Sequence, residues 1–263
     1  MPLRPPPRTP LRLRQRFDGL AAPAVPRLRD AVTFGLAPID TWLGGGLVRG
    51  ALHEVFAASP DDAATALGFA AMLAQRAGRA GGRQRILWVR HAASDARAGQ
   101  LYPLGLAALG LNPAHLVLVR AADVLGVLRA AAEAARSTGL AAVLLELWGE
   151  AALLDLTASR RLSLAAEETA TTVLLLRVAA TPVPSAAASR WMVGALPSRP
   201  LAANAPGRPA LAATLLRHRG GAAVNTWHLE WDHEQRCFRD YDAAAQPGAV
   251  VSLPAGRAVG LAG

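Results

Sequence analysis

The stretch HEVFAASPDDAATALGF, residues 53–69, decides how this chain is expected to fold. An apolar run ends in a short polar loop, and an alanine-rich segment suited to a helix follows it. Many α/β proteins that bind nucleoside triphosphates carry their phosphate-binding loop at such a junction between a strand and a helix. This junction contains two aspartates and has no glycine between Ala57 and Leu67. The stretch therefore predicts a strand–turn–helix unit whose capacity to bind a nucleotide has to be tested residue by residue.

The residues of the junction lack the chemistry of a phosphate-binding loop. The motif is G-x-x-x-x-G-K-[ST], because glycines let backbone N–H groups face the phosphates and the lysine neutralises them. Aligned on the end of the apolar run, its four specified positions fall on Ala57, Asp62, Ala63 and Ala64. The nearest hydroxyl belongs to Thr65, one residue later. None of the groups that bind phosphate or magnesium in the motif is therefore present.

The two aspartates of the loop oppose phosphate binding further. Asp61 and Asp62 would repel a triphosphate, at a cost of about 1 kcal/mol or more per close charge pair in water. Either carboxylate is better suited to cap the helix that begins there and to complement its dipole. We therefore expect a degenerate nucleotide loop, no cofactor and no metal at this position.

The charge of the chain comes from arginine alone. All 28 basic residues of the 263-residue sequence are arginines, which excludes every mechanism that depends on a lysine side chain. The net charge of +9 suits an acidic or polyanionic partner, but an arginine-rich composition is also typical of a GC-rich genome.

No apolar run reaches the length of about 18 residues that spans a bilayer, and the single cysteine excludes an internal disulfide. We expect a cytoplasmic protein without a membrane partner.

Composition divides the chain into three parts. Residues 1–30 hold seven arginines and seven prolines and predict a flexible arm, which either contacts phosphates or a partner or is an unstructured tail. Residues 243–263 are rich in alanine, glycine and proline and predict a loose tail. Residues 31–242 are expected to form one α/β domain.

Strand and helix signals alternate through this domain. Short apolar runs predict parallel strands covered on both faces at 51–57, 85–90, 116–121, 141–147 and 172–177. Helices are expected between them, near 62–78, 98–109, 123–137 and 156–169. Later segments with turns between them predict antiparallel strands at 189–196, 210–217, 224–231 and 236–241. The predicted fold is a mostly parallel sheet flanked by helices, with antiparallel strands toward the C-terminus.

Several spaced blocks of sequence make this order of elements recognisable. They are GLAPIDTWLGGGLVRGALHEVFA (35–57), ILWVR (86–90), GQLYPLGLAALGLNPAHLVLVRA (99–121), AAVLLELWG (141–149), LDLTASRRLSLAAEETATTVLLLR (154–177), SAAASRWMV (185–193) and LLRHRGG (215–221). They resemble the ImuA family, whose members have a RecA-like fold, and the resemblance covers about residues 31 to 235. The resemblance covers neither the arginine-rich arm nor the C-terminal tail.

The resemblance implies a role in the SOS response of bacteria to DNA damage. ImuA-type proteins act in a mutasome for translesion synthesis, with ImuB, a catalytically inactive relative of Y-family polymerases, and an error-prone C-family polymerase. We therefore expect a non-catalytic accessory protein that recruits or bridges an ImuB-like partner and associates with the nucleoid when bound. Single-stranded DNA and RecA are further candidate partners. Two alternatives remain open, namely a DNA-stimulated ATPase with a divergent nucleotide site and a SulA-like inhibitor of cell division.

The same resemblance directs attention to two acidic residues. RecA-type enzymes hold magnesium through water with an aspartate at the end of the fourth strand, and Glu146 takes that place here, followed by Trp148. Without phosphate oxygens, such a site would lack most of the oxygen ligands that magnesium needs. Glu146 and Glu54, which lies in the first strand, are therefore expected to be structural.

Arginines form the second set of candidate residues. In RecA relatives, loops beyond the fourth and fifth strands contact single-stranded DNA, so Arg190 could bind a phosphate while Trp191 offers a stacking face. Alternatively, Trp191 is buried and Arg190 merely solvated. The residues that we consider for binding DNA or a partner are Arg160, Arg161, Arg177, Arg190, Trp191, Arg217 and Arg219.

One cluster of metal-ligating residue types is set aside. His228, Asp232, His233 and Cys237 lie within ten residues, but their spacing matches no common zinc site and no second pair of ligands is near in sequence. A polar edge of two strands and their turn is the expected structure.

Overall fold

The structure is a computed structural model that describes residues 31–241, apart from residues 93, 202–204 and 206. Its strands are β1 (Ala31–Val32), β2 (Leu47–Val48), β3 (Leu52–Ala57), β4 (Arg85–His91), β5 (Leu116–Ala121), β6 (Leu140–Trp148), β7 (Thr172–Val178), β8 (Ser189–Leu196), β9 (Ala210–His218), β10 (Asn225–Asp232) and β11 (Cys237–Asp240). Its helices are α1 (Ala37–Trp42), α2 (Ala63–Gly81), α3 (Ser94–Ala98), α4 (Pro103–Ala108), α5 (Val124–Ala135) and α6 (Leu156–Thr169), with 3-10 helices η3 (Pro60–Asp62) and η4 (Pro113–His115). The predicted arm and tail lie outside the described residues.

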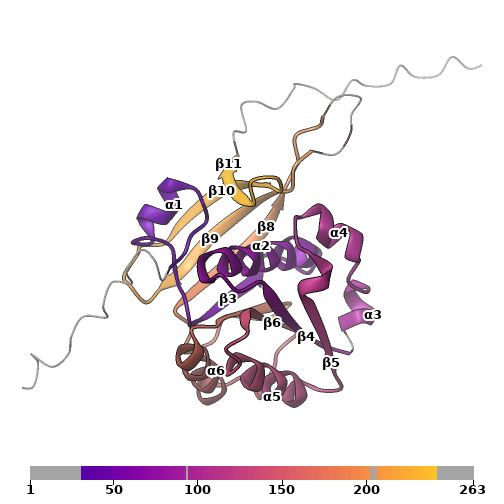
Figure 1. Ribbon diagram of the computed structural model, residues 1–263, viewed down its shortest axis with the longest axis vertical. Coiled ribbons are helices and arrows are strands. Elements are labelled where there is room, and N and C mark those ends of the chain that lie inside the picture. Colours follow the sequence, from indigo (N-terminus) through magenta and orange to yellow (C-terminus); the bar gives the residue numbers. More distant parts are fainter. Residues whose placement is uncertain (1–30, 93, 202–204, 206, 242–263) are drawn as a thin grey trace, which may run out of the picture.

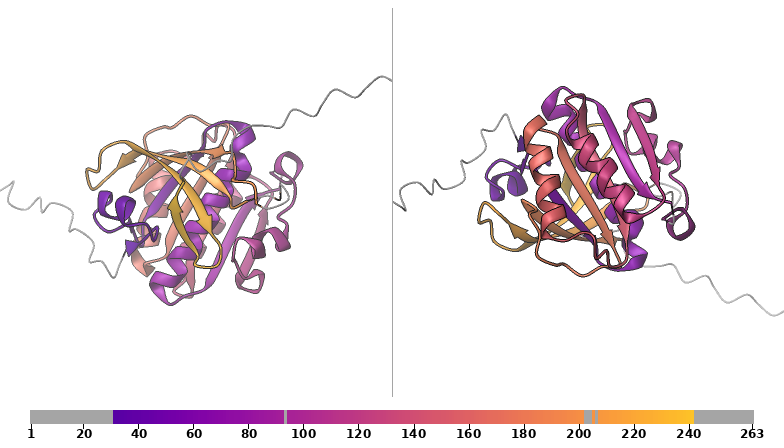
Figure 2. Two further views of the ribbon diagram at one scale, coloured as in Figure 1. Left: turned by 90° about the horizontal axis from the view of Figure 1, so that it is seen from above. Right: turned by 90° about the horizontal axis from the view of Figure 1, so that it is seen from below.

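One nine-stranded sheet organises the molecule, in the order β11-β10-β9-β8-β3-β7-β6-β4-β5 (Figure 1). The six strands from β8 to β5 in this order pair in parallel, whereas β8, β9, β10 and β11 pair antiparallel with one another. Helix α2 covers one face of the sheet, and α5 and α6 lie side by side on the other (Figure 2). The predicted fold class is confirmed.

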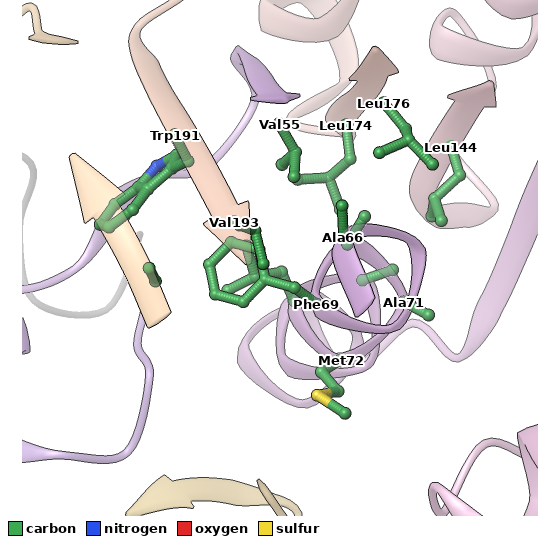
Figure 3. Close-up of a cluster of buried hydrophobic side chains, with 14 of the residues drawn as sticks. Val55, Ala66, Phe69, Ala71, Met72, Leu144, Leu174, Leu176, Trp191 and Val193 are labelled. Atoms are coloured by element: carbon green, nitrogen blue, oxygen red, sulfur yellow. The ribbon is translucent and has the colours of Figure 1, made fainter. Parts of the chain in front are cut away.

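Helix α2 forms because its sequence is rich in alanine, the best helix former, and it ends where Gly82 adopts a left-handed conformation with φ of 67°. Its buried face carries Ala66 and Phe69 and packs against side chains of β3, β6, β7 and β8 (Figure 3). The helix therefore fixes the junction after β3 against the centre of the sheet.

Aromatic side chains join the two ends of the described chain in this core. The Phe34 ring lies 5.4 Å from Trp191, 6.1 Å from Phe69 and 5.3 Å from Phe238 between ring centroids. All four side chains are buried. Because Phe238 comes from β11 and Phe34 precedes α1, these contacts close the antiparallel half of the sheet over α2.

Two expectations about the elements were wrong. The segment 98–109 was expected to be one helix, but α3 and α4 are separate, because Gly99 takes a positive φ of 73° and Pro103 starts a new helix. The strand at 116–121 was expected to be covered on both faces, but β5 is an edge strand and Val117 is 46% exposed.

Candidate functional site

The loop between β3 and α2 is fastened to the neighbouring strand β8. The backbone N–H of Ala58 donates to the Val193 carbonyl at 2.8 Å, and the Asp62 carboxylate accepts from the Ala195 backbone N–H at 2.7 Å. The second oxygen of Asp62 accepts from the Ser59 hydroxyl at 2.7 Å. The loop thus takes a 3-10 turn tied to the sheet instead of an open curve around an anion.

Asp62 therefore does something different from the predicted capping. Its side chain forms no capping hydrogen bond with α2, and the side chain of Asp61 forms none either within the described residues. The hydrogen bond from the Ala195 N–H, together with the one from Ser59, lowers the pKa of Asp62 below its ordinary value. Of the two loop aspartates, Asp61 lines the space beside the loop and Asp62 does not, so one of them faces that space where two were expected.

A cavity of about 520 Å³ occupies the space beside this loop, at the carboxyl ends of β4, β6 and β7. Ala63 and Ala64 from the degenerate loop line one side, whereas Ala57 and Thr65 do not reach it. Apolar side chains form much of the remaining wall. They are Leu67, Leu101, Tyr102, Leu106, Leu109, Trp148, Leu176 and Val178. At the position where the predicted fold would bind a nucleotide, this protein therefore has an open, largely apolar pocket.

Glu146 borders this cavity but its carboxylate is already engaged. Strands β4 and β6 pair with Arg90 opposite Glu146, so the two side chains lie next to each other. The Arg90 Nε donates to Glu146 Oε2 at 2.7 Å and its Nη2 donates to Oε1 at 3.1 Å. The Trp148 indole N–H donates to the same Oε1 at 2.9 Å. Both side chains of the ion pair are 1% exposed.

The ion pair extends into a short charge network. Asp95 at the start of α3 accepts from Arg90 Nη1 at 2.7 Å and lies 3.1 Å from Arg120 Nε. The Gly99 carbonyl accepts two further hydrogen bonds from Arg90 at 3.2 Å. Every nitrogen of the Arg90 guanidinium therefore has an acceptor, and the network positions α3 beside the cavity.

Sequence reasoning missed Arg90, Asp95 and the residues of α4, which build half of this site. A signal for Arg90 was present, since an arginine ends the apolar run ILWVR and has to be neutralised if that strand is buried. Its partner could not be identified from sequence, because the β4–β6 register comes from the sheet order.

A second buried ion pair lies on the other face of the sheet. Arg190 Nε donates to Glu54 Oε2 at 2.8 Å, and the Arg190 guanidinium also donates to the Val183 carbonyl and the Ser185 hydroxyl. Glu54 is buried and Arg190 is mostly so. This pair fixes the crossover from β7 to β8 against the sheet.

Of the two alternatives for this pair, Trp191 is buried and offers no stacking face, whereas Arg190 is paired with Glu54 and not merely solvated. Trp191 is fully buried in the core, where its indole N–H donates to Ser189 Oγ at 2.8 Å. Arg177 is also buried and lies 3.7 Å from Glu150 Oε2. Its guanidinium and that of Arg190 approach the Phe56 ring at 5.8 and 5.7 Å.

The other candidate arginines are exposed, and Arg217 lies opposite Arg190 in the pairing of β8 with β9, where both side chains donate to Ser185. Arg160 and Arg161 lie on the solvent side of α6. Arg217 and Arg219 donate to backbone carbonyls of Ala187 and Ala186, respectively, in the crossover before β8. The candidates that reach solvent thus lie on α6 and at the end of β9, two elements that both contact the crossover before β8.

His53 supplies a further polar contact at the amino end of β3. Its Nε2 lies 2.8 Å from the Val48 carbonyl, which can only accept, so Nδ1 accepts from the Ser189 hydroxyl at 2.7 Å. Burial lowers the pKa of His53 to about 4. The ring is therefore neutral at pH 7 and serves the core.

The residues considered for zinc are spread over a strand pair. Asp232 is buried, accepts from the backbone N–H groups of Glu234 and Gln235, and lies 2.7 Å from Arg239 Nη2. His228 packs edge-on against the Tyr241 ring. Over the part of the chain that the structure describes, no three His, Cys, Asp or Glu side chains are grouped to hold a metal ion.

None of the described helices has the length and apolar character needed to cross a bilayer.

Comparison with known proteins places this geometry in context. No protein-family model matches the sequence. Protein ImuA of Caulobacter vibrioides (strain NA1000 / CB15N) is 34% identical over 238 residues, which cover 81% of this chain and 92% of that protein, and the counterpart from strain ATCC 19089 / CIP 103742 / CB 15 gives the same values. The crystal structure of the RadB recombinase superimposes with a TM-score of 0.53 and 15% identity, over 80% of this chain and all of that one, and shows a shared fold. On the sequence identity and its coverage, the chain belongs to the ImuA family.

Proposed function

We propose that this protein is a non-catalytic accessory factor of translesion DNA synthesis, which recruits an ImuB-like relative of Y-family polymerases into a mutasome. An error-prone C-family polymerase, RecA and single-stranded DNA are the further partners of this proposal. The role follows the resemblance to the ImuA family. The proposal includes a location in the cytoplasm, and on the nucleoid when the protein is bound to its partners.

The engagement of Glu146 is the observation that carries the non-catalytic part of the proposal. This glutamate stands where a RecA-type enzyme would hold magnesium, yet both its oxygens accept hydrogen bonds from Arg90 and Trp148. A metal would have to compete with the buried Arg90 guanidinium for both oxygens of Glu146. The fastening of the β3–α2 loop to β8 supports the same conclusion.

The first test is an assay of ATP hydrolysis with single-stranded DNA present. We expect no thermal stabilisation by ATP and no phosphate release above the level of a Glu146→Gln variant, which removes the charge but preserves the shape of the side chain. Release of phosphate by the wild type that Glu146→Gln abolishes would support the divergent ATPase instead.

The second test is copurification with the ImuB-like partner, using the full chain and a form that lacks residues 1–30. We expect a complex with the full chain, and the shortened form shows whether the arm contributes. Absence of a complex in both forms would refute the recruiting role. Binding to the tubulin-like division protein in a parallel experiment would instead favour the division inhibitor.

A further inference from the structure

We propose that the cavity beside Glu146 is a docking pocket for a bulky apolar side chain of the protein partner, at the place where a nucleotide would lie. The inference rests on the proposed function, because it specifies where the recruited partner is held. It commits to a partner segment that carries a leucine or aromatic anchor, and three features of the pocket support this occupant.

The first feature is the wall of the cavity. Its volume of about 520 Å³ falls within the range of about 300–1,000 Å³ typical of ligand pockets. Leu67 of α2, Leu101 and Trp148 of β6 line it and are half-buried, so part of their apolar surface is open to the cavity. An apolar side chain that enters such a space is removed from contact with water, and this makes the burial of an anchor side chain favourable.

The second feature is the balance of charge. The four charged groups that line the pocket are Arg90, Arg97, Asp61 and Glu146, and they carry two positive and two negative charges. Arg90 and Glu146 neutralise each other inside the protein. Arg97 and Asp61 are exposed and leave the mouth with one charge of each sign. A neutral apolar occupant complements this pocket, whereas a triphosphate would meet no net positive charge.

The third feature is the rim. Tyr102 lines the cavity and is 65% exposed, and Leu104 on the adjoining helix α4 is 67% exposed. Large apolar side chains beside a pocket are a mark of surfaces that bind proteins, and tyrosine is enriched among residues that dominate binding energy. They extend the apolar surface from the cavity onto α4, so an anchor side chain would continue into a wider contact.

The test compares binding of the ImuB-like partner to the full wild-type chain and to three variants by titration calorimetry. Leu104→Asp puts a charge on the rim, and Ala64→Trp fills the cavity from an exposed position at the start of α2. Leu125→Asp is the matched control, because Leu125 is 39% exposed on α5, on the opposite face of the sheet. We expect each of the first two variants to bind about 10-fold more weakly or worse, and the control to bind within about 2-fold of wild type.

Each outcome decides the inference. If wild type binds and both pocket variants bind equally well, with unchanged thermal unfolding, the pocket is not the docking site, and recruitment occurs elsewhere on the protein. If Leu125→Asp weakens binding as much as Leu104→Asp, the contact is not specific to the pocket and the inference is also overturned. If wild type itself does not bind, the proposed function fails together with the inference.

Discussion

The two ends of the parallel strands both hold hydrogen-bonded polar side chains, but one end borders an open cavity and the other is fully buried. At the carboxyl end, Arg90, Glu146 and Trp148 satisfy one another at the wall of an open cavity. At the amino end, His53 and Ser189 form a fully buried hydrogen-bonded network. The comparison teaches that a buried polar group does not by itself mark a functional site in this fold. What distinguishes the carboxyl end is the space that its polar groups leave accessible.

The largest expected effect comes from removing the cation at the cavity. Arg90→Met leaves Glu146 buried without its partner, so the free energy of unfolding is expected to fall by about 3–5 kcal/mol in a urea titration. The double variant Arg90→Met/Glu146→Leu is expected to recover a large part of that loss, because no unpaired charge remains buried. A loss below about 1 kcal/mol for Arg90→Met would mean that Glu146 is solvated in the cavity and does not depend on Arg90.

The next effect tests the amino end through pH. The pKa of His53 is about 4 in the folded protein and near 6.5 in the unfolded chain, so the unfolded state binds more protons between these values. Stability from the neutral ring is complete above pH 6.5 and falls as the pH drops toward 4, by up to about 1.4 kcal/mol per pH unit. The difference between the unfolding free energies of wild type and His53→Gln, measured from pH 7 to pH 4, isolates this contribution. A difference that does not change with pH would show that the ring is open to water.

The smallest effect concerns the loop at the carboxyl end of β3. Asp62→Ala removes the hydrogen bonds from Ala195 and Ser59, and we expect a loss of about 1 kcal/mol at this partly exposed site. Because the folded pKa of Asp62 is lowered, its contribution is present above pH 3.8 and is lost as the pH falls through the folded pKa. Asp61→Ala is the matched control, since Asp61 is exposed and caps neither helix. Equal effects of the two variants would indicate that the loop is not fastened to β8.

Much of the fold was predictable because its strands are short apolar runs and its helices have clear periodicity. Strands β5 and β8 lie at the residues that the sequence predicts, and α6 does too. The segment around α3 and α4 was mispredicted, because its alanines and leucines favour a helix while Gly99 and Pro103 interrupt it. The exposure of β5 could not be predicted, since the sheet order decides which strand lies at the edge.

The site was predictable only in part, and for a different reason. The loss of the phosphate-binding residues can be read position by position from 57 to 65. The cavity, by contrast, is formed by four segments that are distant in sequence, and the pairing of Arg90 with Glu146 depends on the register between β4 and β6. The burial of Trp191 likewise follows from the packing of Phe34, of Phe69 from α2 and of Trp227 from β10 against it, which its immediate sequence neighbours do not reveal.

The aromatic cluster has a consequence for the synthesis of this protein. Phe238 supplies ring contacts to Phe34 and Phe69, which precede it by about two hundred and about one hundred and seventy residues. Until the ribosome has made β11, the nascent chain carries those rings and Trp231 without their last partner. Such long-range closure is slow and leaves apolar surface exposed in the meantime. We therefore expect that chains released before Phe238 are held by chaperones and degraded, so that cells accumulate only molecules in which the antiparallel strands are complete.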